Sequence, residues 1–111
     1  MQLRAEQHNG FLVIRASGDR IDTAGAIKFK DSMRELTQTG DVRVVLDMTT
    51  IAFIDSSGLG AVVAALKALG PGRKLELLGL TPTVQKVFRL TRMDSIFTIH
   101  TTLPEGLRNA V

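Results

Sequence analysis

The sequence of 111 residues contains no cysteine, no tryptophan and no tyrosine. Without cysteine, disulfide frameworks, thiol nucleophiles and thiolate metal sites are excluded, and a reducing compartment is favoured. Without tryptophan and tyrosine, the chain has few aromatic platforms on which nucleic-acid bases could stack. The apolar content of 44% is normal for a globular protein, and the length suits one domain with one buried core.

A long uncharged apolar run is also missing. The longest, Gly58 to Leu66, is far shorter than the ~20 residues that a membrane helix requires. The N-terminus, MQLRAEQHNGFLV, lacks the basic start and apolar h-region of a signal peptide. The net charge of +3 raises the possibility of nucleic acid, but the basic residues are scattered among acids and core positions. We therefore expect a cytoplasmic protein with no membrane or nucleic-acid partner.

Five segments have the pattern of strands. QLRAEQ and FLVIRASG flank Asn9-Gly10, a pair that tolerates positive φ, so the chain is expected to open with an antiparallel hairpin. VRVVLDM is a near-continuous β-branched run, which is typical of a strand covered on both faces. KLELLGL and SIFTIHT are predicted as two further strands.

Helical segments alternate with these strands. In DRIDTAGAIKFKDSMRELTQTG, Asp22 or Thr23 is expected to cap the start of a helix and Gly40 to end it. The apolar residues of this segment recur at helical spacing: Ala26, Phe29, Met33 and Leu36. A second, apolar helix is expected from about Ser57 to Leu69.

A third helix is expected in TPTVQKVFRLTRM, with Thr81 as cap and Pro82 at its first position. The final PEGLRNAV is predicted as a short terminal helix. The order of these elements predicts an α/β fold with a single domain over residues 1–111. Its mixed sheet of about five strands would begin with an antiparallel hairpin and continue with parallel crossovers, covered by three to four helices.

The stretch from Ile54 to Gly60, IDSSGLG, places an acid, two hydroxyls and two glycines between a strand and an apolar helix. A serine hydrolase needs G-x-S-x-G and a histidine base, yet the motif is absent and both histidines, His8 and His100, lie far away in the sequence. The third glycine of a dinucleotide fingerprint and the Gly-Lys-Ser/Thr of a phosphate loop are missing. We expect no catalytic residues, no metal site and no cofactor.

The same stretch has a structural explanation. Asp55 or Ser56 as N-cap would satisfy free backbone N–H groups, an effect worth about 1 kcal/mol. However, each glycine costs a helix roughly 1 kcal/mol against alanine. Gly58 and Gly60 remove side-chain bulk beside the hydroxyls, so another backbone or a nucleotide could approach closely. The residues alone leave both interpretations open.

The segment VRVVLDMTTIAFIDSSGLGAVVAALKAL resembles the signature of the STAS domain, specifically of bacterial anti-sigma factor antagonists. That family has a strand, an F-I/M-D-S-S/T-G-L-G loop and an apolar helix. SGDRIDTAGA resembles its earlier G-E/R-L-D segment, with Ile21 for leucine. LLGLTPTVQKVFRLTRMDSIFTIHTT resembles its closing pattern, so the resemblance covers nearly the whole chain.

The resemblance implies a regulatory function. Ser56 would be phosphorylated by a GHKL-type serine kinase that is also the anti-sigma factor, although chemistry alone does not exclude Ser57. The unphosphorylated protein would bind the kinase and release a sigma factor, and a phosphatase would restore it. Asp22 would lie near the nucleotide of the kinase. The implied partner-binding residues are Asp22, Asp55, Ser56, Ser57, Gly58, Leu59 and Gly60.

Two features depart from the family pattern: the basic net charge of +3, since many antagonists are acidic, and the residue at position 92. Arg92 stands where the family commonly has a glycine that helps to end the third helix. An alternative function is a STAS subunit that docks to a transporter ATPase or joins a multi-STAS assembly without a phosphoswitch.

Overall fold

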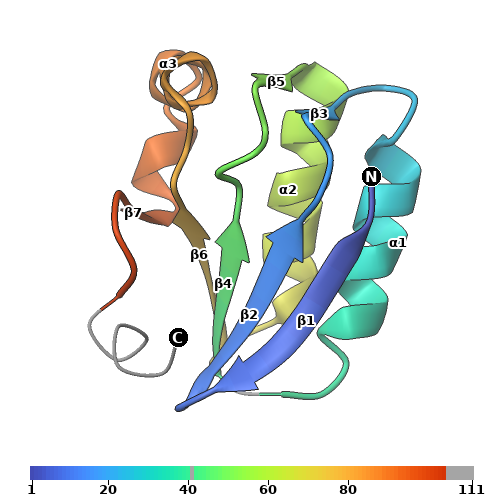
Figure 1. Ribbon diagram of the computed structural model, residues 1–111, viewed down its shortest axis with the longest axis vertical. Coiled ribbons are helices and arrows are strands. Elements are labelled where there is room, and N and C mark those ends of the chain that lie inside the picture. Colours follow the sequence, from blue (N-terminus) through green and yellow to red (C-terminus); the bar gives the residue numbers. More distant parts are fainter. Residues whose placement is uncertain (41, 105–111) are drawn as a thin grey trace.

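The computed structural model describes residues 1–40 and 42–104, and its main feature is a mixed sheet in the order β1-β2-β4-β6-β7 (Figure 1). The five strands are β1 Leu3–His8, β2 Phe11–Ala16, β4 Arg43–Asp47, β6 Lys74–Leu78 and β7 Thr98–His100. β1 pairs antiparallel with β2, and the remaining neighbours are parallel. Asn9 and Gly10 have φ values of 50° and 90°, which confirms the predicted hairpin.

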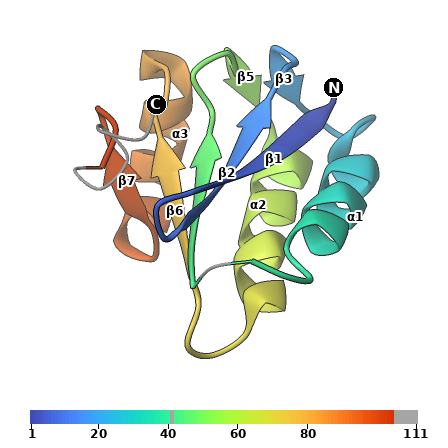
Figure 2. The ribbon, with the colours of Figure 1, turned by 60° about the horizontal axis from the view of Figure 1, so that its bottom comes forward.

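Three α-helices complete the fold: α1 Ala26–Leu36, α2 Ser56–Leu69 and α3 Pro82–Leu90. A 3-10 turn, η1 Met93–Ser95, follows α3. Figures 1 and 2 show α1 and α2 side by side against one face of the sheet, with α3 beyond β6. The predicted fold class is therefore confirmed, while the predicted terminal helix at residues 104–111 falls almost entirely outside the described residues.

The main hydrophobic core lies between the sheet and the helices. Alternate residues of β4 point to opposite faces, so Val44 and Leu46 join this core while Val45 packs in a smaller cluster on the other face. All three side chains are fully buried. This agrees with the expectation that VRVVLDM is covered on both faces.

A second, two-stranded sheet was not predicted. β3 Arg20–Ile21 pairs in parallel with β5 Phe53–Ile54, at the end of the molecule where α2 begins (Figure 1). Two residues are too few to produce a recognisable alternation, so the pattern of the sequence could not reveal these strands. The pairing matters because it brings the segment before α1 next to the start of α2.

The cap predicted for α1 is wrong. The helix begins at Ala26 with Gly25 as N-cap and no side-chain cap, and it ends at Leu36, well before Gly40. Asp22 accepts a hydrogen bond from the Gly25 N–H at 3.3 Å in the preceding turn. Thr23 makes its contacts with the start of α2 instead, as described below.

The α3 helix begins as predicted at Pro82, with Thr81 as N-cap residue. The hydroxyl of Thr81, however, donates to the carbonyl of Ile51 at 2.8 Å and does not cap the helix. The strand predicted over SIFTIHT is reduced to β7, because the chain is still in η1 up to Ser95.

Arg92 ends α3 in a left-handed conformation, with φ 60° and ψ 18°. This conformation costs a residue with a Cβ roughly 1–2 kcal/mol but is nearly free for glycine. We expect Arg92→Gly to raise the free energy of unfolding by about 1 kcal/mol after the greater flexibility of glycine in the unfolded chain is included. Urea unfolding measures this change. Arg89→Gly inside α3 is the control and should lower it by about 1 kcal/mol; equal effects would contradict the explanation.

Candidate functional site

The candidate site lies at the N-terminus of α2, directly after β5. Asp55 is the N-cap residue, with extended backbone, and its Oδ1 accepts a hydrogen bond from the Gly58 N–H at 2.8 Å. The prediction that Asp55 or Ser56 caps this helix is confirmed for Asp55. Ser56 and Ser57 follow in the first turn, and both are exposed.

Thr23 links the segment before α1 to this helix start. Its backbone N–H donates to Asp55 Oδ2 at 3.0 Å, and its hydroxyl lies 3.1 Å from the same oxygen and 3.2 Å from Ser57 Oγ. A hydroxyl has a single proton. Both contacts are satisfied when Thr23 donates to the carboxylate and Ser57 donates to Thr23. Asp55 thus holds together two segments that are 32 residues apart in the chain.

The carboxylate of Asp55 accepts hydrogen bonds from the Gly58 amide and from the amide and hydroxyl of Thr23. The hydrogen bond from the Gly58 amide, supported by those from Thr23, holds the pKa of Asp55 below its ordinary value, although desolvation acts in the opposite direction. A carboxylate with a lowered pKa and occupied lone pairs is a poor general base. The hydrogen bonds of Asp55 thus fix the start of α2 against the segment that carries Thr23.

The two serines differ in their surroundings. Ser57 is tied to Thr23 and lines a groove of about 170 Å³ between α1 and α2. Ser56 lines a wider groove of about 410 Å³ on the other side of α2, next to η1. Within residues 1–40 and 42–104, the Ser56 hydroxyl makes no hydrogen bond. Of the two hydroxyls, that of Ser56 is the one an incoming group can reach without breaking a contact.

The two glycines have different roles. A Cβ at Gly58 would lie 1.9 Å from the carbonyl oxygen of Ile21, so this glycine admits the backbone of the chain's own strand β3. A Cβ at Gly60 would meet nothing within 4 Å, so Gly60 exposes bare helix surface. We expected these glycines to let another backbone approach. At Gly58 the approaching backbone is that of β3 in the same chain, whereas at Gly60 the space is empty and accessible to a partner. Leu59 is buried and lies at the base of the wider groove.

Asp22 lies next to Thr23, on the segment that contacts α2. Its Oδ1 accepts from the Gly25 amide and its Oδ2 lies 3.7 Å from Arg20 Nη1. The structure therefore brings Asp22 to the same end of the molecule as Ser56, although no direct contact joins the two side chains.

Sequence reasoning missed two residues of this site. Thr23 was considered only as a helix cap, and its link to Asp55 became visible only once β3 and β5 were paired. Phe53 is the first residue of the family motif but was not named as a site residue, yet it is 44% exposed and the guanidinium of Arg20 lies 5.7 Å from the centre of its ring. The motif could have indicated this residue, but the exposure of its side chain became visible only in the structure.

Other kinds of site find no support in the described part of the chain. Within residues 1–40 and 42–104, no three His, Asp or Glu side chains gather where they could hold a metal ion. None of the helices described there has the length and apolar character needed to cross a membrane.

Comparison with known proteins places this geometry in context. The family model described as the STAS domain matches residues 2–106. The anti-sigma F factor antagonist of Paenibacillus polymyxa is 26% identical over 102 residues, covering 90% of this chain and 86% of that protein. The anti-sigma-F factor antagonist RsfB of Mycobacterium tuberculosis is 24% identical over 100 residues, covering 90% of this chain and 81% of that protein.

Solved structures share the fold. The crystal structure of an anti-sigma factor antagonist from Mycobacterium paratuberculosis gives a TM-score of 0.83 at 24% identity, covering 98% of this chain and 92% of that one. SpoIIAA of Bacillus has been solved unphosphorylated and phosphorylated. The two forms give TM-scores of 0.66 and 0.67 at 20% and 22% identity, covering 97% of this chain and 94% and 98% of those chains.

Proposed function

Because this chain belongs to the STAS domain family, we propose that it is an anti-sigma factor antagonist that a partner serine kinase switches off by phosphorylating Ser56. In the unphosphorylated state it binds that kinase, which is also the anti-sigma factor, and so releases a sigma factor. A phosphatase reverses the modification. The protein itself acts by binding, and the catalytic groups for phosphoryl transfer come from its partners.

The observation that carries this proposal is the free hydroxyl of Ser56 beside an open groove. Its neighbours Ser57 and Asp55 are already engaged with Thr23. Because Asp55 already accepts hydrogen bonds from Thr23 and Gly58, we assign the general base for the transfer to the kinase.

The position of Ser56 also suits a switch that leaves the domain folded. Phosphorylation adds about −1.5 to −2 charges at neutral pH. Ser56 is the first residue of α2, where the helix dipole stabilises negative charge. The effect therefore falls on the partner, because the phosphate adds bulk and repels acidic groups and nucleotide phosphates on the facing surface. A penalty of several kcal/mol corresponds to a loss of affinity on the order of 100-fold or more.

Within the site, we propose that different residues act in different ways. Ser56, Ser57 and Gly60 are exposed and contact the partner directly. Gly58 and Asp55 act by holding the helix start against the segment that carries Asp22 and Thr23.

The test is phosphorylation by the cognate kinase with Mg²⁺ and ATP, followed by mass spectrometry of the intact protein and its peptides. We expect one phosphate on wild type, none on Ser56→Ala and one on the matched variant Ser57→Ala, because only Ser56 has a free hydroxyl. Labelling of Ser56→Ala to the wild-type extent would overturn the site. If the kinase neither binds nor labels the wild type, the antagonist function itself is wrong.

A further inference from the structure

Two grooves run along the exposed side of α2, one on each side of a line of small residues. Gly60 and Ala64 line both grooves. Ser57 lies in the groove shared with α1, and Ser56 in the groove shared with η1. The exposed face of α2 is therefore continuous with the site of the proposed phosphorylation.

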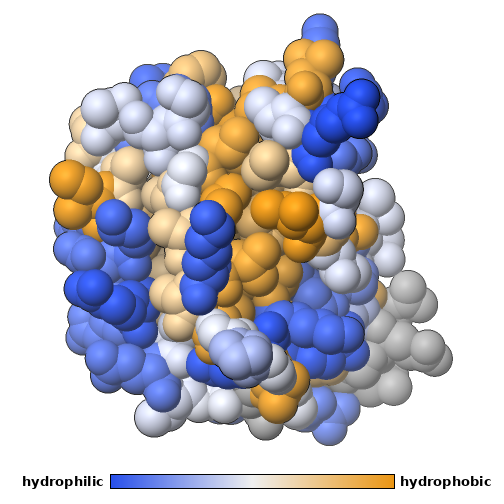
Figure 3. All heavy atoms as spheres, turned by 180° about the vertical axis from the view of Figure 1, so that it is seen from behind, coloured by the Kyte–Doolittle hydropathy of each residue, from blue (hydrophilic) through white to orange (hydrophobic). Residues whose placement is uncertain are grey.

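This face is strongly apolar. Ile27 of α1 is 71% exposed and lines one groove, while Val63 and Met93 line the other. Figure 3, which views the molecule from the helical side, shows a broad hydrophobic area there, bounded by hydrophilic side chains. A contiguous apolar surface on a folded domain marks a site where another molecule binds.

The ionised residues that line the two grooves have one sign. Lys30 is the only ionised residue that lines the first groove, and Lys67 is the only one that lines the second. Lys67 is also the only charged residue in the whole of α2. Among the residues that the structure describes, neither lysine forms an ion pair. Acidic groups on a partner that covers this face would complement both lysines.

We propose that this surface, called here the docking face and made of Ile27, Lys30, Gly60, Ala64, Lys67 and Met93, binds an apolar segment of the kinase that carries acidic side chains. The inference rests on the proposed function and adds the chemistry of the partner surface. The apolar groups supply contact area, and the two lysines steer the encounter and fix its orientation. The same acidic surface of the partner would repel a phosphate on Ser56.

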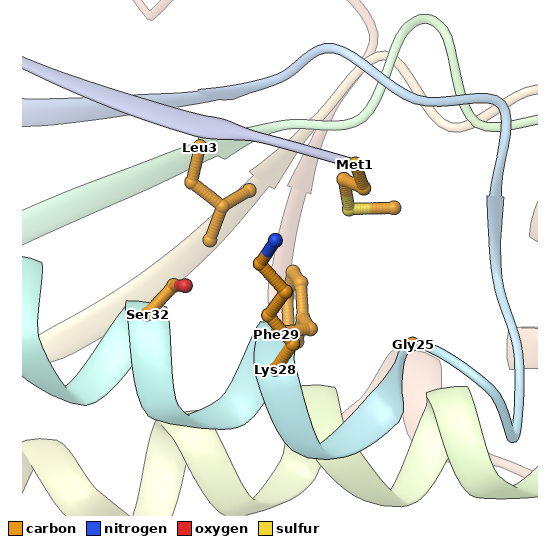
Figure 4. Close-up of a pocket in the computed structure, with 6 residues that line it drawn as sticks. All are labelled: Met1, Leu3, Gly25, Lys28, Phe29 and Ser32. Atoms are coloured by element: carbon orange, nitrogen blue, oxygen red, sulfur yellow. The ribbon is translucent and has the colours of Figure 1, made fainter.

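The chain contains a matched control for this charge argument. Lys28 lies on α1 like Lys30, and both are exposed. Figure 4 shows Lys28 directed instead toward the strand β1, in a small pocket of about 40 Å³ that it shares with Met1, Leu3 and Phe29. Replacing Lys28 changes the net charge as much as replacing Lys30 but leaves the docking face intact.

The experiment is surface plasmon resonance of the unphosphorylated protein on the immobilised kinase, at low and high NaCl. We expect Lys30→Glu and Lys67→Glu each to weaken binding on the order of tenfold, mainly through a slower association rate. The difference from wild type should shrink at high salt because exposed charges are screened. Lys28→Glu should bind within about twofold of wild type. Ile27→Ala should weaken binding through a faster dissociation rate, since it removes apolar contact.

The outcomes separate this inference from the proposed function. If the kinase binds and labels wild type, but Lys30→Glu and Lys67→Glu behave like Lys28→Glu, the docking face is wrong and the phosphoswitch stands. If all three charge variants lose the same affinity, net charge alone steers binding and the docking face is again wrong. If the kinase neither binds nor labels wild type, the proposed function fails and the docking face fails with it. Circular dichroism of each variant identifies any loss that results from unfolding.

Discussion

Gly58→Ala is expected to lower the free energy of unfolding by about 3 kcal/mol or more, the upper range for overpacking a rigid interior. The new methyl group would lie 1.9 Å from the carbonyl oxygen of Ile21 and 2.7 Å from its carbonyl carbon. These are backbone atoms of β3, which is held by its pairing with β5. They cannot turn away as a side chain would. The helix start must move away from β3 instead, and the hydrogen bonds between Asp55 and Thr23 would be lost.

The matched control is Gly60→Ala, two residues further along α2. No atom lies within 4 Å of the added methyl group, and alanine favours a helix over glycine by roughly 1 kcal/mol. We expect this variant to be as stable as wild type or up to about 1 kcal/mol more stable. Urea unfolding measures both changes. The packing argument fails if the two variants have the same stability.

These two variants also separate stability from binding. Gly60 belongs to the proposed docking face, so we expect the methyl group of Gly60→Ala to weaken the proposed complex with the kinase while leaving the fold intact. Gly58 faces inward, so Gly58→Ala should weaken the complex only as far as it displaces the start of α2.

Glu76→Ala is expected to have the second large effect, a loss of about 3 kcal/mol of stability, at the lower end of the range for breaking a buried ion pair. Glu76 lies on β6 and is 1% exposed. Its carboxylate accepts hydrogen bonds from Arg43 Nε at 2.7 Å and Nη2 at 2.6 Å, and from His100 Nε2 at 2.7 Å. Removal leaves a cavity and two polar side chains without their acceptor. We choose the lower end because Arg43 is half-exposed and can bind water.

Glu35→Ala is the control for Glu76→Ala. Glu35 is an exposed residue of α1, and substitutions of this kind usually change stability by less than about 0.5 kcal/mol. Thermal or urea unfolding of both variants at pH 7 makes the comparison. A loss at Glu76 no greater than that at Glu35 would show that the ion pair is not needed to hold β4, β6 and β7 together.

The same network predicts a dependence on pH. Burial raises the pKa of Glu76, but the hydrogen bonds from Arg43 and His100 outweigh it, so the pKa lies below its ordinary value. The unfolded chain then binds a proton at a higher pH than the folded one. This stabilisation is complete above the ordinary pKa of about 4.3 and is lost as the pH falls through the lower folded value. Between pH 6 and pH 3, Glu76→Gln should therefore lose less stability than wild type. The urea concentration at the midpoint of unfolding, measured at each pH, follows this loss. If the midpoints of the two proteins fall by the same amount, the lowered pKa of Glu76 is not the cause.

Much of the fold follows from local patterns. The Asn9-Gly10 turn, the β-branched run of β4 and the helical spacing in α1 and α3 each depend on residues close together in the chain. The spacing of their apolar residues and the residue types of the turn therefore predict these elements without a structure. The cap of α1 was predicted wrongly because the hydroxyl of Thr23 contacts Asp55, far away in the sequence. Thr81 is the N-cap residue of α3 as predicted, but its hydroxyl bonds to Ile51 and not to the helix.

The sequence by itself determined the alternation of strands and helices and narrowed the cap of α2 to Asp55 or Ser56, and its resemblance to the family motif predicts Ser56 as the phosphorylated residue. Only the tertiary structure decided which residues of that motif face inward. Gly58 meets Ile21 because β3 pairs with β5, and Ser57 meets Thr23 for the same reason. The regular spacing of apolar residues in a sequence reflects the geometry of a single helix or strand. Contacts between segments more than 30 residues apart do not change this spacing, so they cannot be predicted from it. For that reason the free hydroxyl of Ser56 and the engaged hydroxyl of Ser57 look alike in the sequence and differ in the folded chain.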